Sequence, residues 1–452
     1  MADASSPSLA ARAAPRSRDV HLVVEDGACQ LFLPNGSRLF DIDAELAEAF
    51  EQALASPDGD AVSALLAEHR LDGPVEIDDA PPEDMAVRAL SLAVAQKCNL
   101  GCGYCYAQGG EFGGPAKSMT VETALASVDL LLKETLAGER ANLAFLGGEP
   151  LIARDVVRAA TRYAAARAAE RGVPLTFSVT TNGTLVTEED ADFFEEHGFA
   201  VTVSLDGVGP DHDRLRPFGG GQGSFDRIVA RISPLLARQR RMQVSARITV
   251  TPGNLDLRKT LDAFVDLGFH SVGFSPMLSS PNARHEMQSD DLAVMLAAMV
   301  ECGAEFERRT AIGERYPFAN LLNALREIHR GTQRPYPCGA GGGYFGVSAD
   351  GELSACHRFV GDPQGALGDL VDGVDRAKQT QWLSDRHVAR QEPCNSCWAR
   401  YLCGGGCHHE TLHRGRPACD FIRGWLHYCL AAYGRLAHRK VQKSVTADMR
   451  PI

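Results

Sequence analysis

The sequence lacks a long hydrophobic run, an excess of positive charge and an apolar segment near its N-terminus. A membrane-spanning helix needs about 18 or more consecutive apolar residues, and no such run occurs in the 452 residues. The net charge of −12 argues against a general nucleic-acid or membrane-surface binder. Residues 1–18 are rich in Ala, Ser and Arg without an apolar centre, which favours a disordered tail over a secretion signal. We therefore expect a cytoplasmic protein with no nucleic-acid or membrane partner.

The composition is ordinary except for its many cysteines. There are 13 cysteines, and in a reducing compartment so many point to metal rather than to disulfides. Three lie at 98–105 and seven between 338 and 419, whereas Cys29, Cys302 and Cys429 stand apart. A lone free cysteine is commonly a small buried hydrophobe. We interpret these three as core residues, with metal ligation left open for Cys429.

Hydrophobic periodicity first separates a small N-terminal module at residues 19–85. It begins with three short strand patterns, two of them joined by the hairpin signal Asn35-Gly36, and continues with helical patterns at 44–54 and 61–69. This order favours a winged-helix-like module whose exposed edge strand captures a leader or substrate peptide. A plain N-terminal cap on the next domain is the alternative.

Residues 86–335 alternate short apolar runs with helical patterns, as buried parallel strands and their crossover helices do. Six repeats fit an α/β fold with a partial (β/α)6 barrel, and residues 277–335 form a helical bridge at its end. The chemistry is then expected where the C-terminal ends of the strands meet the loops. The expected strands are 89–95, 142–146, 175–180, 200–204, 244–250 and 271–274, and the expected helices 120–138, 153–171, 187–197, 224–238 and 257–267.

The C-terminal part, residues 336–440, is rich in glycine and cysteine and poor in periodicity. Such a segment has little core of its own and would need metal to order it. We expect a final helix near 421–439 and a tail at 441–452.

Cys98, Cys102 and Cys105 follow the first expected strand directly. Three thiolates at this Cys-x3-Cys-x2-Cys spacing can ligate three irons of a [4Fe–4S] cluster and leave the fourth iron open. A zinc site fits less well, because zinc commonly takes four ligands as two Cys-x2-Cys pairs. The spacing, with Tyr104 inside it, resembles the signature of the radical S-adenosylmethionine (SAM) enzymes. That resemblance implies that SAM binds the open iron and is cleaved to a 5′-deoxyadenosyl radical.

Later motifs extend the resemblance to contacts with SAM. Gly147-Gly148-Glu149-Pro150 is similar to the family's Gly-Gly-Glu-Pro turn, which implies that this backbone and Glu149 bind the methionyl amino group. Arg247 matches an arginine that pairs with the SAM carboxylate. Ordinary turn, cap and ion-pair roles are the alternatives. The implied cofactor-binding residues are Tyr104, Gly147, Gly148, Glu149, Ser178, Asn182 and Arg247.

Asp206 follows the fourth expected strand and should project into the barrel mouth. It resembles an aspartate that lies near substrate in peptide-modifying members of the family, which makes it the candidate catalytic base. Two other roles stay open, namely holding the SAM ribose and holding a neighbouring arginine.

The C-terminal cysteines resemble the SPASM extension of radical SAM peptide maturases, which carries two auxiliary [4Fe–4S] clusters. Sulfatase maturases and some other members have a further cysteine where this sequence has Tyr344. Unless Cys302 or Cys429 contributes, the near cluster keeps three ligands, and we hypothesise that its open iron binds a substrate thiolate. By position, the distal cluster is held by Cys394, Cys397, Cys403 and Cys419, and the near cluster by Cys338, Cys356 and Cys407.

The segments 337–361 and 419–425 narrow the resemblance to thioether-forming maturases. These are the maturases of quinohemoprotein amine dehydrogenase, which join cysteine to a methylene carbon of Asp or Glu in a small subunit, and the six-cysteine-peptide (SCIFF-type) maturases, which join cysteine to threonine. The resemblance implies an enzyme with SAM and three [4Fe–4S] clusters. Its implied partners are a peptide or small subunit with a leader segment and an electron donor such as flavodoxin or ferredoxin.

Other functions remain open at this point. One is a formylglycine-forming sulfatase maturase, and another is a Cys–Thr, sactipeptide-like thioether maturase. The alternatives without catalysis are a structural metal-binding scaffold and a leader-peptide binding protein whose catalytic half has decayed.

Overall fold

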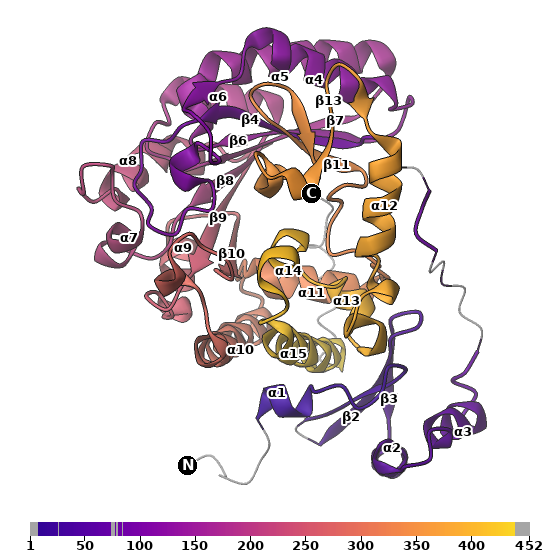
Figure 1. Cartoon of the computed structure of the whole chain (residues 1–452). Coiled ribbons are helices and arrows are strands. Elements are labelled where there is room, and N and C mark those ends of the chain that lie inside the picture. Colours follow the sequence, from indigo (N-terminus) through magenta and orange to yellow (C-terminus); the bar gives the residue numbers. More distant parts are fainter. Residues whose placement is uncertain (1–7, 26, 74–76, 78–79, 84, 439–452) are drawn as a thin grey trace.

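Figure 1 shows the computed structural model of the chain, which describes residues 8–25, 27–73, 77, 80–83 and 85–438. A large curved sheet is covered by helices on its outer side, the cysteine-rich segment lies beside it, and a small sheet lies below (Figure 1). Among the described residues we find no helix that is long and apolar enough to cross a membrane. The tail expected at 441–452 lies outside the described residues.

The N-terminal unit has the three strands and two helices that the sequence predicts. Its strands pair antiparallel in the order β1–β2–β3, and the turn before β3 contains Gly36 at φ 86°. Leu22, Leu31 and Phe50 form its buried core. The elements are β1 (His21–Glu25), β2 (Ala28–Leu33), β3 (Arg38–Ile42), α2 (Ala44–Ala55) and α3 (Ala61–Glu68).

The main sheet contains the six parallel strands predicted from the alternating pattern. They lie in the order β10–β9–β8–β7–β6–β4, and within the described part of the chain β10 and β4 do not pair, so the barrel is open. A short strand, β5 (Lys117–Ser118), pairs antiparallel with β4. The six strands are β4 (Ala89–Gln96), β6 (Ala141–Gly147), β7 (Leu175–Thr181), β8 (Ala200–Ser204), β9 (Gln243–Val250) and β10 (Ser271–Pro276).

Helices cover the outer face of this sheet, where alternate strand residues such as Phe145 and Val179 are buried. The first helix begins after Thr120, whose hydroxyl accepts a hydrogen bond from Thr123 N. The helix ends at Lys133, whereas the sequence predicted an end at residue 138. Gly138 itself lies in a turn with φ 84°. The helices are α4 (Val121–Lys133), α5 (Arg154–Arg171), α6 (Glu188–His197), α7 (Pro210–Leu215), α8 (Phe225–Ala237) and α9 (Leu257–Asp266), of which α7 was not predicted.

The cysteine-rich segment shares the core of the barrel, which the sequence did not show. β11 pairs parallel with β4, and β12, β13 and β14 continue the same sheet. Phe345 and Leu353 are buried in the barrel core. Strands of two to four residues carry too little periodicity to be recognised from sequence. The elements are β11 (Tyr344–Val347), β12 (Glu352–Ser354), β13 (Ala366–Asp369), β14 (Gly373–Val374), α12 (Arg376–Arg386), α13 (Arg400–Cys403) and α14 (His408–Arg414).

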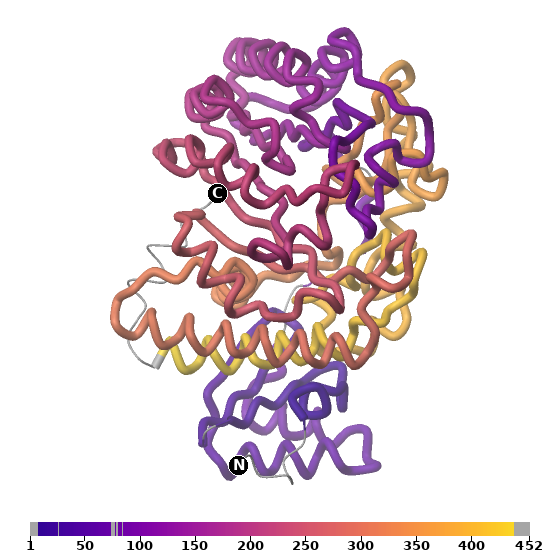
Figure 2. Tube along the Cα trace, turned by 90° about the vertical axis from the view of Figure 1, so that its left-hand side faces the viewer, coloured from indigo at the N-terminus to yellow at the C-terminus, as the bar shows by residue number. Residues whose placement is uncertain are grey.

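Two long helices lie side by side between the barrel and the N-terminal unit (Figure 2). They are α10 (Ser289–Ala311), from the predicted helical bridge, and α15 (Cys419–His438), the predicted final helix; α11 (Ala319–His329) packs with them. Cys302 and Cys429 are fully buried here, as expected for core residues.

Residues 8–18 differ from the tail expected at 1–18, because they have a defined structure. The short helix α1 (Leu9–Arg12) packs against α15. Ala13 is fully buried, and its carbonyl accepts a hydrogen bond of 2.8 Å from Trp398 Nε1. Four helical residues show no periodicity in a sequence, and their partners lie far along the chain. Residues 1–7 of the expected tail are outside the described part.

Candidate active site and cluster sites

The triplet of cysteines lies in the loop that leaves the C-terminal end of β4, and all three thiols are partly buried. Burial raises the pKa of Cys98 and of Cys102, the latter to about 11, and the neighbouring thiols add to the shift. Leu100 N and Asn182 Nδ2 donate to Cys98 Sγ over 3.4 and 3.7 Å, and such donors favour a thiolate. Three partly buried sulfur donors beside N–H donors fit a cluster held by three cysteines.

The Gly147-Gly148 turn at the end of β6 lies directly against this loop. Gly148 N donates to Ala95 O at 2.8 Å. A Cβ on Gly147 would lie 2.3 Å from Ala95 O, and a Cβ on Gly148 would lie 2.3 Å from Lys97 O. Only glycine permits so close an approach. The turn therefore presents backbone beside the triplet, as a contact to a bound SAM requires.

The Glu149 carboxylate is fully buried and already has three donors from the protein. It accepts hydrogen bonds from Leu151 N, Thr181 Oγ1 and Asn182 N over 3.0, 2.7 and 2.7 Å. Burial raises its pKa, and these donors oppose the shift. Its side chain therefore joins the end of β6 to the end of β7.

Ser178 and Arg247 lie on the inner face of the barrel. Their neighbours along β7 and β9 are buried beneath the helices, and side chains alternate along a strand. Arg247 is exposed to solvent, but the surrounding protein desolvates its guanidinium and lowers its pKa, and the charge of Glu410 opposes the shift. It donates to Ser275 Oγ. That partner is a hydroxyl, and the nearby Glu410 is paired with Arg358 at 2.7 Å, so the charge of Arg247 is available to an anionic ligand.

Asp206 is fully buried rather than open to the barrel mouth. Its carboxylate accepts hydrogen bonds from Tyr104 OH, from Thr249 N at 2.8 Å and from Arg216 Nη1 at 3.5 Å. Arg216 also donates to the Tyr104 hydroxyl at 2.6 Å. Of the three roles that the sequence left open, holding a neighbouring arginine agrees with this geometry. Through Tyr104 the network also anchors the triplet loop.

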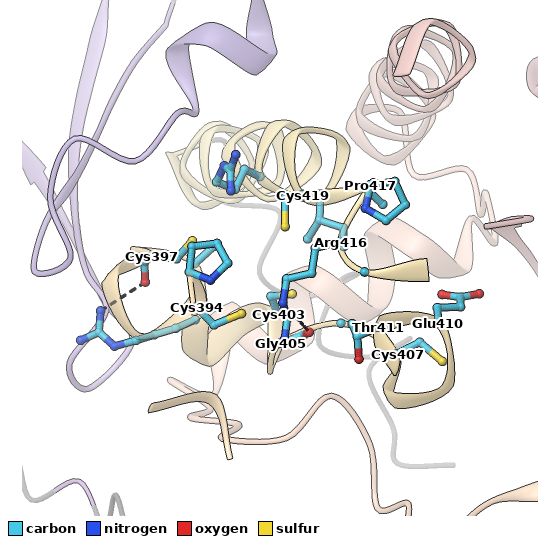
Figure 3. Close-up of a pocket in the computed structure, with 18 of the residues that line it drawn as sticks. Cys394, Cys397, Cys403, Gly405, Cys407, Glu410, Thr411, Arg416, Pro417 and Cys419 are labelled. Atoms are coloured by element: carbon cyan, nitrogen blue, oxygen red, sulfur yellow. Dashed lines mark hydrogen bonds between the residues drawn. The ribbon is translucent and has the colours of Figure 1, made fainter. Parts of the chain in front are cut away.

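Five cysteines of the C-terminal part line one cavity (Figure 3). Four of them are Cys394, Cys397, Cys403 and Cys419, the four that the SPASM resemblance assigns to the distal set. Burial raises the pKa of Cys394 to about 11, Arg416 opposes the shift, and the other three thiols add to it. Four thiols converging on one cavity beside a guanidinium fit a cluster with four protein ligands.

Cys338, Cys356 and Cys407 form a separate near set. Cys407 also lines the cavity of the distal set, but in Figure 3 its side chain lies apart from the other four cysteines. Burial raises the pKa of Cys356 to about 12, and the charges of Cys407 and Cys338 add to the shift. The structure thus brings the three together, and as three sulfur donors they fit a cluster with one iron left without a protein thiolate.

Tyr344 lies at the edge of the near set, with no cysteine at this position. Its backbone N donates to Gly339 O at 3.0 Å, and its hydroxyl lies 2.8 Å from His357 Nδ1. The two unassigned candidates lie elsewhere: Cys302 is buried on α10 near Arg258, and Cys429 is buried on α15 near Glu307. Among the described residues, the near set therefore has three cysteines.

Sequence reasoning missed the side chains that lie between the triplet and the near set. Arg358 donates to Glu410 at 2.7 Å and to Cys407 Sγ at 3.8 Å, and its guanidinium lies 5.2 Å from the ring centre of Tyr106. Tyr106 adjoins Cys105, so these groups link the two sites. Their positions next to cysteines were the available signal, but sequence does not show that the two segments meet.

Comparison with known proteins agrees with this architecture. Residues 92–267 match the family described as the Radical SAM superfamily. A serine-type anaerobic sulfatase-maturating enzyme of Klebsiella aerogenes is 26% identical over 340 residues, covering 72% of this chain and 81% of that protein.

Two solved structures share the fold. Native anSMEcpe with bound AdoMet and the Cp18Cys peptide has a TM-score of 0.61 at 19% identity, covering 80% of this chain and 99% of that one. SuiB of Streptococcus suis bound to the precursor peptide SuiA has a TM-score of 0.52 at 14% identity, covering 89% and 97%. The predicted α/β partial barrel with a cysteine-rich C-terminal region is confirmed. The chain is therefore similar to the radical SAM superfamily over residues 92–267, and to an anaerobic sulfatase-maturating enzyme over 72% of its length.

Proposed function

We propose that the chain is a radical SAM maturase that joins a cysteine sulfur to a carbon within a peptide or small protein subunit, as in the link between Cys and an Asp or Glu methylene. The observation that carries the proposal is the near set of three cysteines, with Tyr344 in place of a fourth. A position without a protein thiolate suits a substrate thiol, because a metal deprotonates a thiol and fixes it in place.

Three [4Fe–4S] clusters and SAM would be held by the residues described above. The triplet would hold the SAM-binding cluster, the backbone of Gly147-Gly148 and the side chains of Ser178 and Arg247 would contact SAM, and the near and distal sets would hold the auxiliary clusters. When bound, these groups supply a 5′-deoxyadenosyl radical that takes a hydrogen atom from an unactivated carbon, and a route for the surplus electron.

The chain's own residues position the reactants and keep the site in shape. Arg247 offers a fork that suits the SAM carboxylate. Asp206 holds Arg216 and Tyr104 and thereby the triplet loop. We do not require Asp206 as a base, because a substrate thiol that binds as the thiolate has already lost its proton.

The N-terminal unit is the proposed holder of the substrate's leader segment. β3 is at the edge of its three-stranded sheet, and among the described strands it pairs with β2 alone, which leaves its other side for an extended peptide. The related anSMEcpe and SuiB were both solved with peptides bound. A small cytoplasmic donor such as flavodoxin or ferredoxin is the proposed source of the electron.

Formylglycine formation is the second candidate, because the Klebsiella relative is a sulfatase-maturating enzyme. Tyr344 weighs against it, since sulfatase maturases have a further cysteine at this point of the chain.

The variant Tyr344→Cys tests the proposal, with Tyr344→Phe as the matched control. Residue 344 adjoins the near set, since a Cβ on Gly339 would lie 3.3 Å from the Tyr344 Cβ. A cysteine there supplies the missing thiolate. We expect Tyr344→Cys to keep its iron and to form 5′-deoxyadenosine but to lose the cross-linked product, whereas Tyr344→Phe keeps the product. Undiminished cross-linking by Tyr344→Cys would contradict the proposed role of the near set.

A further inference from the structure

A group of metal-ligating side chains lies outside the three cysteine sets. His409 and His413 are four residues apart on α14, so their imidazoles lie on the same face of the helix. Asp362 faces them from the loop that follows Cys356. One potential ligand atom from each of the three residues lies within 4.8 Å of the other two.

The contacts hold these side chains in place. His413 Nε2 lies 2.7 Å from one carboxylate oxygen of Asp362, and the other oxygen accepts a hydrogen bond of 2.9 Å from Gln364 N. The rings of His409 and His413 are 4.5 Å apart. Buried Phe359 packs 5.0 Å from the His409 ring and forms an apolar wall behind the pair.

An ion pair between His413 and Asp362 does not account for His409. Nδ1 of His409 is buried and has no hydrogen-bond partner in the described part of the chain. A buried nitrogen without a partner is unfavourable. The nearby cation Arg358 does not block a metal ion, because its charge is paired with Glu410 at 2.7 Å.

We propose that His409, His413 and Asp362 bind a zinc ion that is distinct from the iron–sulfur clusters. Two imidazoles and a carboxylate are a ligand set that zinc accepts, with a fourth position left for water. None of these ligands is a cysteine, so the site does not compete with the near or distal set for sulfur.

The ion acts as a clip between two segments that each carry a cysteine of the near set. α14 begins immediately after Cys407, and the loop with Asp362 follows Cys356 by a few residues. Joining Asp362 to His413 through a metal ion fixes how far these two cysteines can separate. This role is independent of which peptide the enzyme modifies.

The test is a zinc titration of the full chain, purified without oxygen and with its clusters in place. Zinc per chain is measured by elemental analysis, its affinity by competition with a chelating indicator, and its ligands by X-ray absorption at the zinc edge. We expect one zinc per chain with nitrogen and oxygen at about 2.0–2.2 Å and no sulfur at about 2.3 Å. His413→Ala and Asp362→Asn each weaken binding by more than about 100-fold. The exposed His69 provides the matched control, and His69→Ala leaves the affinity unchanged.

Two results overturn the proposal. Sulfur among the zinc ligands would place the metal in a cysteine set, and unchanged affinity in both His413→Ala and Asp362→Asn would exclude these residues as ligands. Iron content and circular dichroism identify a variant that has not folded. Asp362→Asn keeps an oxygen for Gln364 N, so it removes the charge with the least structural change.

Discussion

Replacing Asp206 with Asn distinguishes a residue that anchors the triplet loop from a catalytic base. Asp206 is fully buried, and the side chain of its partner Arg216 is 11% exposed. Asn keeps the shape and can still accept the hydrogen bond from Thr249 N, but it leaves the guanidinium without a carboxylate. Breaking a buried ion pair in this way costs about 3–5 kcal/mol.

This cost should be visible as loss of stability as well as loss of activity. For a barrel of about 250 residues, each kcal/mol lowers the midpoint of thermal unfolding by about 2 °C or more. We therefore expect a fall of at least about 5 °C, measured by circular dichroism on protein kept free of oxygen. Because Tyr104 lies inside the triplet, iron content and SAM binding should fall too. The double variant Asp206→Asn/Arg216→Gln should recover part of the loss, since it removes both charges.

The base hypothesis predicts the opposite pattern. If Asp206→Asn keeps its unfolding midpoint, its iron and its SAM affinity but forms no product, Asp206 acts on the substrate and the anchoring role is refuted.

Three other changes probe the rest of the account. Gly148→Ala places a Cβ 2.3 Å from a backbone oxygen of the triplet loop and should lower the iron bound there. In the control Gly114→Ala the nearest atom to the new Cβ is 3.7 Å away, so the iron content should not change. Equal iron in both variants would contradict the close approach. Cys429→Ala should leave the iron of the near cluster unchanged in Mössbauer spectra, and loss of that cluster would make Cys429 its fourth ligand. Burial lowers the pKa of His21 well below its usual value of about 6.5 and the charge of His427 lowers it further. The N-terminal unit, which contains His21, is therefore most stable above about pH 6.5 and becomes less stable as the pH falls below that value. Limited proteolysis between this unit and the barrel should be faster at about pH 5.5 than at about pH 7.5. Equal rates would contradict the shift.

Most of the barrel was predictable because each of its strands is a short apolar run between amphipathic helices. Every predicted strand is present with its ends within two residues. Most elements that were missed have too few residues to show a period: α1, α7, α13, α14, β5 and the strands β11–β14. The exception is α12, which has 11 residues but is mostly polar, so its apolar positions form no clear stripe. The stability of the short elements comes from partners far along the chain, as when β11 pairs with β4.

The sequence places the ten clustered cysteines in two segments, and the family resemblance divides them into three sets; this division stays a prediction. The direction of a side chain was not predictable. Glu149 turns into the protein to accept three hydrogen bonds, and Asp206 meets Tyr104 from a strand far away in the sequence. Neither contact leaves a periodic or spacing signal in the chain.

The mass of a candidate peptide after reaction with SAM and a reductant tests the central claim most directly. A thioether link removes two hydrogen atoms: one passes to 5′-deoxyadenosine, and the other leaves the thiol as a proton while an electron departs. We predict this mass loss together with the disappearance of one alkylatable thiol and no aldehyde. The same loss with every thiol intact and an aldehyde formed would show serine oxidation instead and would contradict the thioether proposal.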